Sequence, residues 1–215
     1  MEETPGADDD GALPDGGDPD AAHVNGLDVA ECTRCESLVE SRSRIVNGTG
    51  PDDAALVFVG EAPGAREDEQ GEPFVGRSGG VLDDALRDAG LSRADVRITN
   101  CVRCRPPDNR DPHREELANC RGYLETEIER VDPELVVTLG KVPGEHLLER
   151  DVAVTGEAGD VTDMTVAGTP QPVMICVHPA ATLYDPSQQT TFKSTLEKAA
   201  EFTDGESGQR RLGDF

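Results

Sequence analysis

The chain has 215 residues, enough for one domain with a core of its own. Its 44 Asp and Glu against 20 Lys and Arg give a formal net charge of −24, which predicts a protein from a high-salt cytoplasm or, alternatively, a merely acidic, well-solvated surface. The same charge argues against nucleic-acid binding unless arginine is concentrated locally, because polyanions repel. No apolar run approaches the length of a membrane span and no signal peptide is recognised, so we expect a cytoplasmic protein without a membrane partner.

Composition divides the chain into a domain at residues 28–202 and two polar ends, a disordered acidic tail at 1–27 and a C-terminal tail at 203–215. Apolar runs alternating with amphipathic segments predict a three-layer α/β/α fold around a central, mainly parallel four-stranded sheet. In chain order we expect a helical or irregular bridge at 38–45, a strand at 56–59, a helix at 78–89 capped by Ser78, a strand at 95–99, helix 115–130, strand 135–139, a short helix at 145–149, a weakly patterned hairpin at 151–172, strand 173–177 and helix 190–202.

Polar side chains follow three of the four predicted strands. Glu61 comes after the first strand, Asn100 after the second and His178 after the fourth. The carboxyl ends of parallel strands meet at one edge of a sheet, where ligands bind, and Phe74 adds an aromatic face from the segment after the first strand. Each of these residues alone has an ordinary explanation as a turn or loop residue. Their convergence predicts a site.

Six cysteines in an intracellular chain indicate metal ligands or buried thiols before disulfides. Four thiolates gathered together select zinc or an iron–sulfur cluster, and the structural alternative is a set of plain buried cysteines. Cys176 lies inside an apolar strand and is expected to be a core thiol. Counting residues leaves two quartets open: Cys32, Cys35, Cys104 and Cys120, or Cys32, Cys35, Cys101 and Cys104.

Four segments in order resemble the family 4 uracil-DNA glycosylases, the iron–sulfur branch of the uracil-DNA glycosylase superfamily. They are Gly-Glu-Ala-Pro-Gly at 60–64, Gly-Glu-Pro-Phe-Val-Gly-Arg-Ser-Gly at 71–79, Thr-Asn-Cys-Val-Arg-Cys-Arg-Pro-Pro-Asp-Asn-Arg at 99–110, and His-Pro at 178–179. The match runs from about Cys32 to the last predicted helix and so covers nearly the whole domain. The resemblance implies a [4Fe–4S] cluster rather than zinc, held by Cys32, Cys35, Cys104 and Cys120.

The resemblance also implies a role for each residue of the predicted site. Phe74 corresponds to the aromatic that stacks on uracil, Asn100 to the amide that binds the base edge, and His178 to the histidine near uracil O2. Glu67 corresponds to the residue that crowds the pyrimidine 5-position and excludes the methyl group of thymine, and Gly60 and Ala62 belong to the same substrate-binding motif.

Ala62 stands where the best-known branch has a water-activating aspartate, so we assign the placement of water to Glu61 and Asn109. The resemblance places a wedge for the vacated base stack at Leu183 and Tyr184. The chain has Ala180 where the family commonly has serine, which removes a phosphate donor. Local positive charge for DNA is expected from Arg77, Arg105 and Arg110.

These observations predict a monofunctional enzyme that hydrolyses the N-glycosidic bond of flipped-out uracil in single- or double-stranded DNA and leaves an abasic site, as in base excision repair. No lysine nucleophile is evident near the site, which argues against strand cleavage through a Schiff base. The resemblance implies a monomer. The alternatives are a non-catalytic metal-cluster module that binds DNA or accompanies replication, and a redox protein built around the cysteines.

Overall fold

A computed structural model of the chain describes residues 24–25, 27–166 and 168–203. The two predicted tails lie almost entirely outside these residues. Within the predicted N-terminal tail, β1 (Val24–Asn25) pairs antiparallel with β2 (Asp28–Val29), so paired backbone begins ahead of the expected boundary. Among the described helices, none is both long and apolar enough to cross a lipid bilayer.

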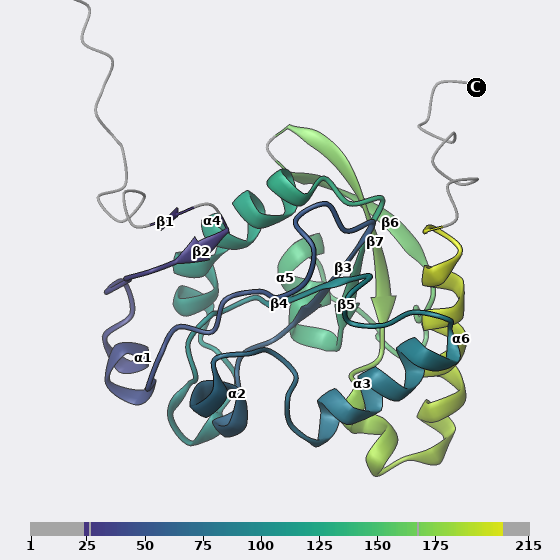
Figure 1. Ribbon diagram of the computed structural model, residues 1–215, viewed down its shortest axis with the longest axis horizontal. Helices are drawn as coiled ribbons and strands as arrows, with labels where there is room; N and C mark the ends of the chain where they lie inside the picture. The colour runs from purple at the N-terminus through teal and green to yellow at the C-terminus, as the bar shows by residue number, and fades with distance from the viewer. Residues whose placement is uncertain (1–23, 26, 167, 204–215) are drawn as a thin grey trace, which may run out of the picture.

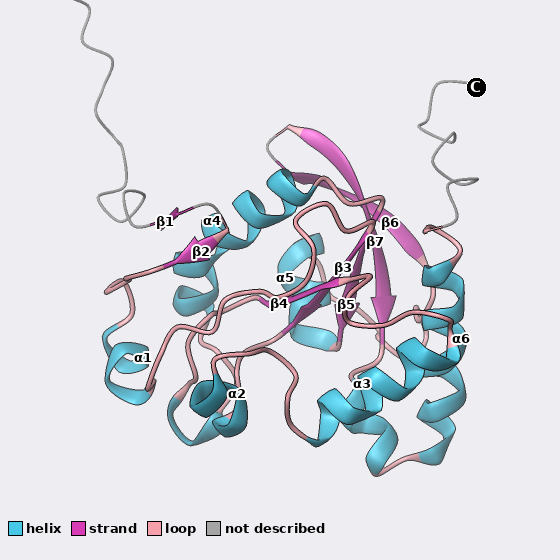
Figure 2. Cartoon of the chain, viewed as in Figure 1, coloured by secondary structure: helices cyan, strands magenta, loops and turns pink. Residues whose placement is uncertain are grey.

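The central sheet has five strands in the order β4-β3-β5-β7-β6 (Figure 2). The four predicted strands are confirmed and run parallel, whereas β6 pairs antiparallel with β7. The sheet therefore has one strand more than the four predicted. The strands are β3 (Leu56–Gly60), β4 (Arg97–Asn100), β5 (Leu135–Leu139), β6 (Val161–Val166) and β7 (Thr169–Cys176).

The additional strand comes from the weakly patterned segment. Only Met164 and Val166 of β6 are buried, because β6 lies at the sheet edge and offers one face to solvent. The first residues of β7 include Pro170 and Pro172, which lie opposite β6 in the antiparallel ladder. Proline is tolerated in such a pairing at the sheet edge, but its presence argues against a strand when only the sequence is considered. The predicted hairpin is therefore real, and it extends the sheet.

The helices that flank the sheet begin earlier than their apolar patterns predict. The third helix begins at Arg77 after the N-cap Gly76, so Ser78 lies inside its first turn instead of capping it. The last helix begins at Pro186, and the N-cap Asp185 accepts a hydrogen bond from the Ser187 N–H at 2.9 Å. The helical elements are α1 (Glu36–Ser41), α2 (Ala65–Gln70), α3 (Arg77–Asp88), α4 (Arg114–Val131), α5 (Lys141–Leu148), α6 (Pro186–Ala200) and the 3-10 segments η2 (Pro107–Asn109) and η3 (Pro179–Leu183).

Alternation along the strands divides the core into two layers. Leu56 and Phe58 of β3 pack with the apolar side chains of α3 and α6. Val57 and Val59, which point to the opposite face, pack with those of α4 and α5. Helices thus cover both faces of the sheet (Figure 1), and the predicted three-layer α/β/α architecture is confirmed.

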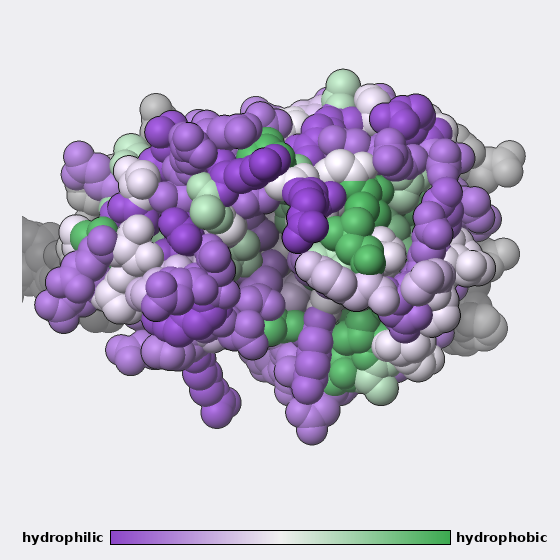
Figure 3. Space-filling view, turned by 90° about the horizontal axis from the view of Figure 1, so that it is seen from below, coloured by the Kyte–Doolittle hydropathy of each residue, from purple (hydrophilic) through white to green (hydrophobic). Residues whose placement is uncertain are grey.

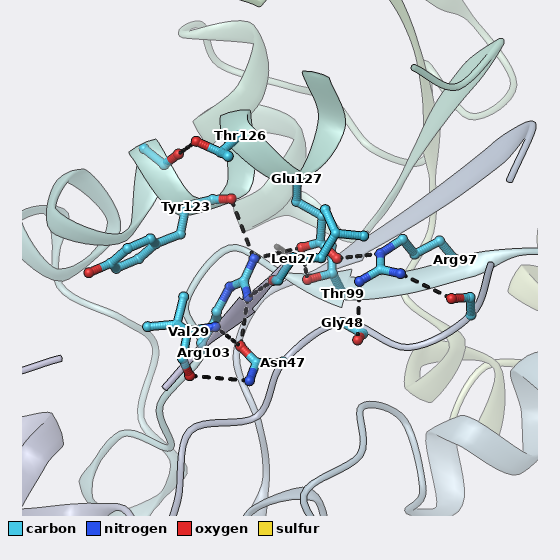
Figure 4. Close-up of polar contacts among 12 residues, drawn as sticks. Leu27, Val29, Asn47, Gly48, Arg97, Thr99, Arg103, Tyr123, Thr126 and Glu127 are labelled. Atoms are coloured by element: carbon cyan, nitrogen blue, oxygen red, sulfur yellow. Dashed lines mark hydrogen bonds and ion pairs between the residues drawn. The ribbon is translucent and has the colours of Figure 1, made fainter. Parts of the chain in front are cut away.

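A buried ion network ties the N-terminal segment to the sheet (Figure 4). Glu127 of α4 is completely buried between two arginines, accepting from Arg97 Nε at 2.6 Å and from Arg103 Nη2 at 2.8 Å. The hydroxyl of Thr99 donates to the same carboxylate at 2.8 Å. Arg103 Nη1 also donates to the carbonyl of Leu27 at 2.9 Å. The loop that follows β4 is therefore anchored on both α4 and the segment ahead of α1.

Candidate active site at the carboxyl ends of the strands

A cavity of about 170 Å³ opens at the carboxyl ends of the parallel strands. It is smaller than the roughly 300–1,000 Å³ of sites for drug-sized ligands, which suits one small ring. Figure 3 shows this face of the molecule, which is mostly hydrophilic, with apolar side chains gathered in a few patches. The cavity brings together six of the predicted residues with two more, and is lined by Glu61, Ala62, Gly64, Glu67, Phe74, Ser78, Asn100 and His178.

Gly60 allows the aromatic ring and the amide of the cavity to meet. A Cβ at Gly60 would lie 2.4 Å from Asn100 Oδ1 and 2.6 Å from both Cε2 and Cζ of Phe74. The Phe74 ring therefore packs directly on the last residue of β3, with Asn100 at the end of the neighbouring strand β4 beside it. Its centroid is 6.1 Å from that of the His178 ring, and the two planes are inclined by 34°.

The backbone after β7 fixes the protonation state of His178. The N–H of Ala180 donates to His178 Nδ1 at 3.1 Å, so Nδ1 is the acceptor and the ring proton resides on Nε2. Burial lowers the pKa of His178, which keeps the imidazole neutral. A neutral ring with an Nε2–H group at the cavity can donate a hydrogen bond to an anionic or carbonyl oxygen. Ala180 thus contributes its backbone to the site, although it lacks a side-chain hydroxyl.

Glu67 forms part of the cavity wall from the short helix α2. Its Oε1 accepts from the Gly76 N–H at 3.2 Å, and its Oε2 lies 2.8 Å from where a Cβ of Gly64 would be. The next residue, Asp68, also turns inward and accepts from the Ser43 N–H at 2.8 Å. These two buried carboxylates explain why an acidic run without an apolar face forms a helix here. The sequence pattern did not predict this helix.

Glu61 has an acidic neighbour that the sequence did not indicate. Burial, followed by the negative charge of Asp111 and a hydrogen bond to it, raises the pKa of Glu61 to about 7. Asn109, predicted to share the placement of water, is exposed, accepts from Arg105 Nε at 2.8 Å and is not among the residues that line the cavity. The structure therefore places Asp111, two residues further on, beside Glu61.

Two exposed side chains follow His178 in the chain. Leu183 is 44% exposed and Tyr184 77% exposed, both at the end of η3. Arg77 Nη2, at the start of α3, donates to Tyr184 Oη at 3.4 Å. Arg77 precedes the cavity-lining Ser78, so this contact links Tyr184 to the start of α3, whereas Leu183 lines a separate hollow between α3 and α6.

The two other predicted DNA-binding arginines differ in their surroundings. Arg110 binds the carboxylate of Glu116 with both Nη atoms, at 2.8 and 2.6 Å. This carboxylate also accepts from the His113 N–H at 2.7 Å and so helps to begin α4. Arg105 lines a separate, open hollow of about 430 Å³ between α1 and η2.

The family model of the uracil DNA glycosylase superfamily matches residues 47–201. The chain belongs to this superfamily. It is 37% identical over 178 residues to the type-4 uracil-DNA glycosylase of Archaeoglobus fulgidus, covering 81% of this chain and 89% of that protein. It is 39% identical over 172 residues to the type-4 uracil-DNA glycosylase of Pyrobaculum aerophilum, covering 78% of this chain and 87% of that protein. It is 43% identical over 136 residues to the type-4 uracil-DNA glycosylase of Thermotoga maritima, covering 63% of this chain and 70% of that protein. The resemblance to the type-4 branch is confirmed.

In this uracil DNA glycosylase superfamily member, four cysteines from three segments influence one another. Burial, with smaller contributions from the thiols of Cys104 and Cys32 and an opposing one from Arg103, raises the pKa of Cys120 to about 12. Burial likewise raises the pKa of Cys104, and Cys32 and Cys35 add to the effect. Cys101 is fully buried in the apolar cluster under α4 and, of these thiols, only Cys120 affects its pKa. Through these contributions Cys32, Cys35, Cys104 and Cys120 are linked to one another, whereas Cys101 is linked only to Cys120.

Hydrogen-bond donors point at these sulfur atoms. Arg42 Nη1 donates to Cys104 Sγ at 2.8 Å, and Asn119 Nδ2 to Cys35 Sγ at 3.4 Å. The buried phenol oxygen of Tyr123 lies near Cys32 and has no hydrogen-bond partner among the described residues. Among all the residues that the structure describes, no three thiol, imidazole or carboxylate groups are close enough to hold a single metal ion. Cys176 is buried in the core under α6, as predicted.

Proposed function

We propose that this protein is a monofunctional uracil-DNA glycosylase that hydrolyses the N-glycosidic bond of uracil in DNA and leaves an abasic site for base excision repair. The observation that carries the proposal is the single cavity where an aromatic ring, a strand-end amide and a neutral imidazole meet, in a chain whose relatives are named type-4 uracil-DNA glycosylases. A non-catalytic DNA-binding or redox module has no need of all three groups in one cavity.

Binding begins with a uracil that has left the base stack or is already unstacked in a single strand. Phe74 offers the ring on which the base stacks, beside Asn100. The amide of Asn100 has both a donor and an acceptor, so it matches the edge of uracil and not that of cytosine, whose donor–acceptor order differs. The buried wall formed by Glu67 against Gly64 and Gly76 leaves little room for a 5-methyl group.

Cleavage leaves positive charge on the sugar and negative charge on uracil. The Nε2–H group of His178 would donate to O2 of the departing base, and a neutral donor suits this step because it requires no proton transfer. Ala62 cannot activate water. We therefore assign the placement of the attacking water to Glu61, because burial and then the neighbouring Asp111 raise its pKa to about 7. Asn109 is a second candidate for placing the water. This role requires a loop conformation that turns its side chain toward the base.

We propose that Cys32, Cys35, Cys104 and Cys120 hold a [4Fe–4S] cluster rather than zinc. Zinc requires four sulfurs about 2.3 Å from one ion, and the described thiols form no such group. A cubane cluster binds each thiolate at a separate iron and so accepts wider spacing. The N–H donors at Cys104 and Cys35 suit anionic sulfur. When bound, the cluster would supply a cross-link among the three segments that carry its ligands.

The metal assignment is tested by composition and colour. Anaerobically purified protein should contain about four irons and four acid-labile sulfides and show a broad visible band. Cys120→Ala should lose the colour, whereas Cys101→Ala, its matched control in the same region, should keep it. A colourless protein with one zinc per chain, or loss of colour in Cys101→Ala only, would overturn the assignment.

The activity is tested with oligonucleotides that contain one uracil, in single strands and opposite guanine, across a series of KCl concentrations. We expect free uracil, alkali-labile abasic sites and no strand breaks before alkali. We also expect activity to persist in molar salt, because the net charge of −24 favours a protein from a high-salt cytoplasm. Binding of the same DNA without uracil release would instead support the non-catalytic module. We propose that the enzyme acts in the cytoplasm. We also propose that it acts as a monomer, and sedimentation of the active fraction would test this oligomeric state.

A further inference from the structure

The aromatic residue of the cavity has an unusual backbone conformation. Phe74 lies between α2 and α3 (Figure 1) with a φ of 56°, in the left-handed region that bulky residues rarely adopt. It is also 6% exposed, so it is held within the protein rather than at a mobile surface turn. Such a conformation persists only where surrounding contacts determine it, and such residues cluster at functional sites.

One guanidinium group binds the backbone at this position. Arg93, in the loop after α3, donates from Nη2 to the carbonyl of Phe74 and from Nη1 to the carbonyl of Pro73 at 3.0 Å. Its Nε donates to Asp83 Oδ1 of α3 at 2.6 Å, and Glu72 Oε1 lies 3.6 Å from Nη1. The rigid planar fork of arginine suits two adjacent carbonyls, which the point charge of lysine cannot bind in the same way.

The first turn of α3 closes the opposite side of the same peptide. A Cβ at Gly79 would lie 1.6 Å from the carbonyl oxygen of Phe74 and 2.3 Å from its carbonyl carbon. The carbonyl of Phe74 is therefore in contact with both Gly79 and Arg93. Because a rotation about the N–Cα bond of Phe74 moves its carbonyl and its Cβ together, a change in φ would break the bond to Arg93 and turn the ring away from Gly60 and His178.

We propose that Arg93 is a positioning residue that holds Phe74 in the left-handed conformation from which its ring stacks on the base. Arg93 touches neither the base nor the reacting atoms and acts through Phe74. The proposal rests on the proposed function. It adds a residue from outside the four motifs, which contacts the second motif at Glu72, Pro73 and Phe74.

A double-mutant cycle in the full chain tests this coupling. Arg93→Ala should lower kcat/KM on single-stranded uracil DNA about tenfold, the size of one lost charge-assisted hydrogen bond. In a Phe74→Ala background, Arg93→Ala should add less than a twofold loss, because the ring it positions is absent. Arg93→Lys should recover part of the activity. The matched control is Arg87→Ala, which removes an exposed arginine paired with Asp84 at 2.8 Å and should leave kcat/KM within twofold.

Two outcomes of the cycle would overturn the proposal: a full tenfold loss in the Phe74→Ala background, or an equal loss in Arg87→Ala. A second measurement does not require catalysis. In protein labelled with 4-fluorophenylalanine, the ¹⁹F resonance of Phe74, assigned by its absence in Phe74→Leu, should shift in Arg93→Ala and not in Arg87→Ala. An unchanged resonance would refute the role of Arg93 even if the wild type released no uracil, whereas an inactive wild type with the expected shift would refute only the proposed function.

Discussion

Replacing Gly60 by alanine tests the geometry on which the cavity depends. The φ of Gly60 is not in the left-handed region, so alanine can adopt the backbone and the added methyl is the only perturbation. That methyl would lie 2.4 Å from Asn100 Oδ1 and 2.6 Å from two ring carbons of Phe74. Ordinary carbon contacts are about 3.5–4.0 Å, so the ring and the amide must each move by about 1 Å. Misplacement on this scale costs on the order of 10²-fold in rate.

The same clash should lower stability. Overpacking of this kind typically costs about 1–3 kcal/mol, and for a domain of this size each kcal/mol lowers Tm by roughly 2–4 °C. Gly80→Ala is the matched control, because no atom lies within 4 Å of its added methyl and it lies inside α3. Alanine in a helix interior should there stabilise by about 0.5–1 kcal/mol.

The assays are thermal unfolding followed by circular dichroism and single-turnover uracil release, both in high salt. Gly60→Ala should lose activity and stability together, and Gly80→Ala should gain stability without losing activity. A Gly60→Ala protein with wild-type Tm and wild-type rate would show that Phe74 and Asn100 do not pack on the end of β3. The cavity described above would then be wrong.

Three further predictions concern charge and hydrogen bonding. Glu61 has a pKa of about 7 and is assigned its role as the ionised carboxylate, so uracil release should fall as pH drops through 7. Asp111→Asn removes a neighbouring negative charge and should move the midpoint of the pH–rate profile to lower pH. An unmoved midpoint would show that Asp111 does not influence the ionisation of Glu61. Glu127→Gln leaves the buried guanidinium of Arg103 without a counter-charge and that of Arg97 with only the exposed carboxylate of Asp52, and should cost about 3–5 kcal/mol in urea unfolding. Glu129→Gln, exposed on the same helix, should change little; equal values for both variants would contradict a stabilising network. Asn100→Asp replaces the amide donor by an acceptor and should slow uracil release by roughly 10–100-fold, so an unchanged rate would remove Asn100 from the site.

The strands that position the site could be predicted because they are buried on both faces. β3 and β5 are fully buried and almost entirely apolar; β3 ends in Gly60 and β5 is followed by Gly140, so both strands and their ends can be recognised in the sequence. β6 and α2 were not predicted as separate elements because neither carries a clear apolar pattern. β6 is stabilised by pairing at the sheet edge, and α2 by carboxylates that bind backbone N–H groups of distant segments.

The cavity residues at strand ends could be predicted for the same reason, whereas the contacts that the loops make could not. Asp108 and Asn109 both have positive φ, and this turn carries Asp111 rather than Asn109 to Glu61. Arg93 acts through backbone carbonyls, which leave no trace in the sequence. The choice between Cys101 and Cys120 depends on the packing of α4 against the sheet, so counting alone could not make it.

The partners of two arginines determine how the protein can approach a polyanion. Of the three arginines in the loop after β4, Arg103 is bound to Glu127 and Arg110 to Glu116. Each phosphate neutralised by a protein cation releases a counterion and contributes about −0.9 to the slope of log K against log salt on duplex DNA. With Arg77 and Arg105 as the remaining predicted contacts, the slope should be close to −2. An enzyme with so shallow a slope gains little from long-range attraction and recognises its substrate mainly after contact, through the extruded base itself.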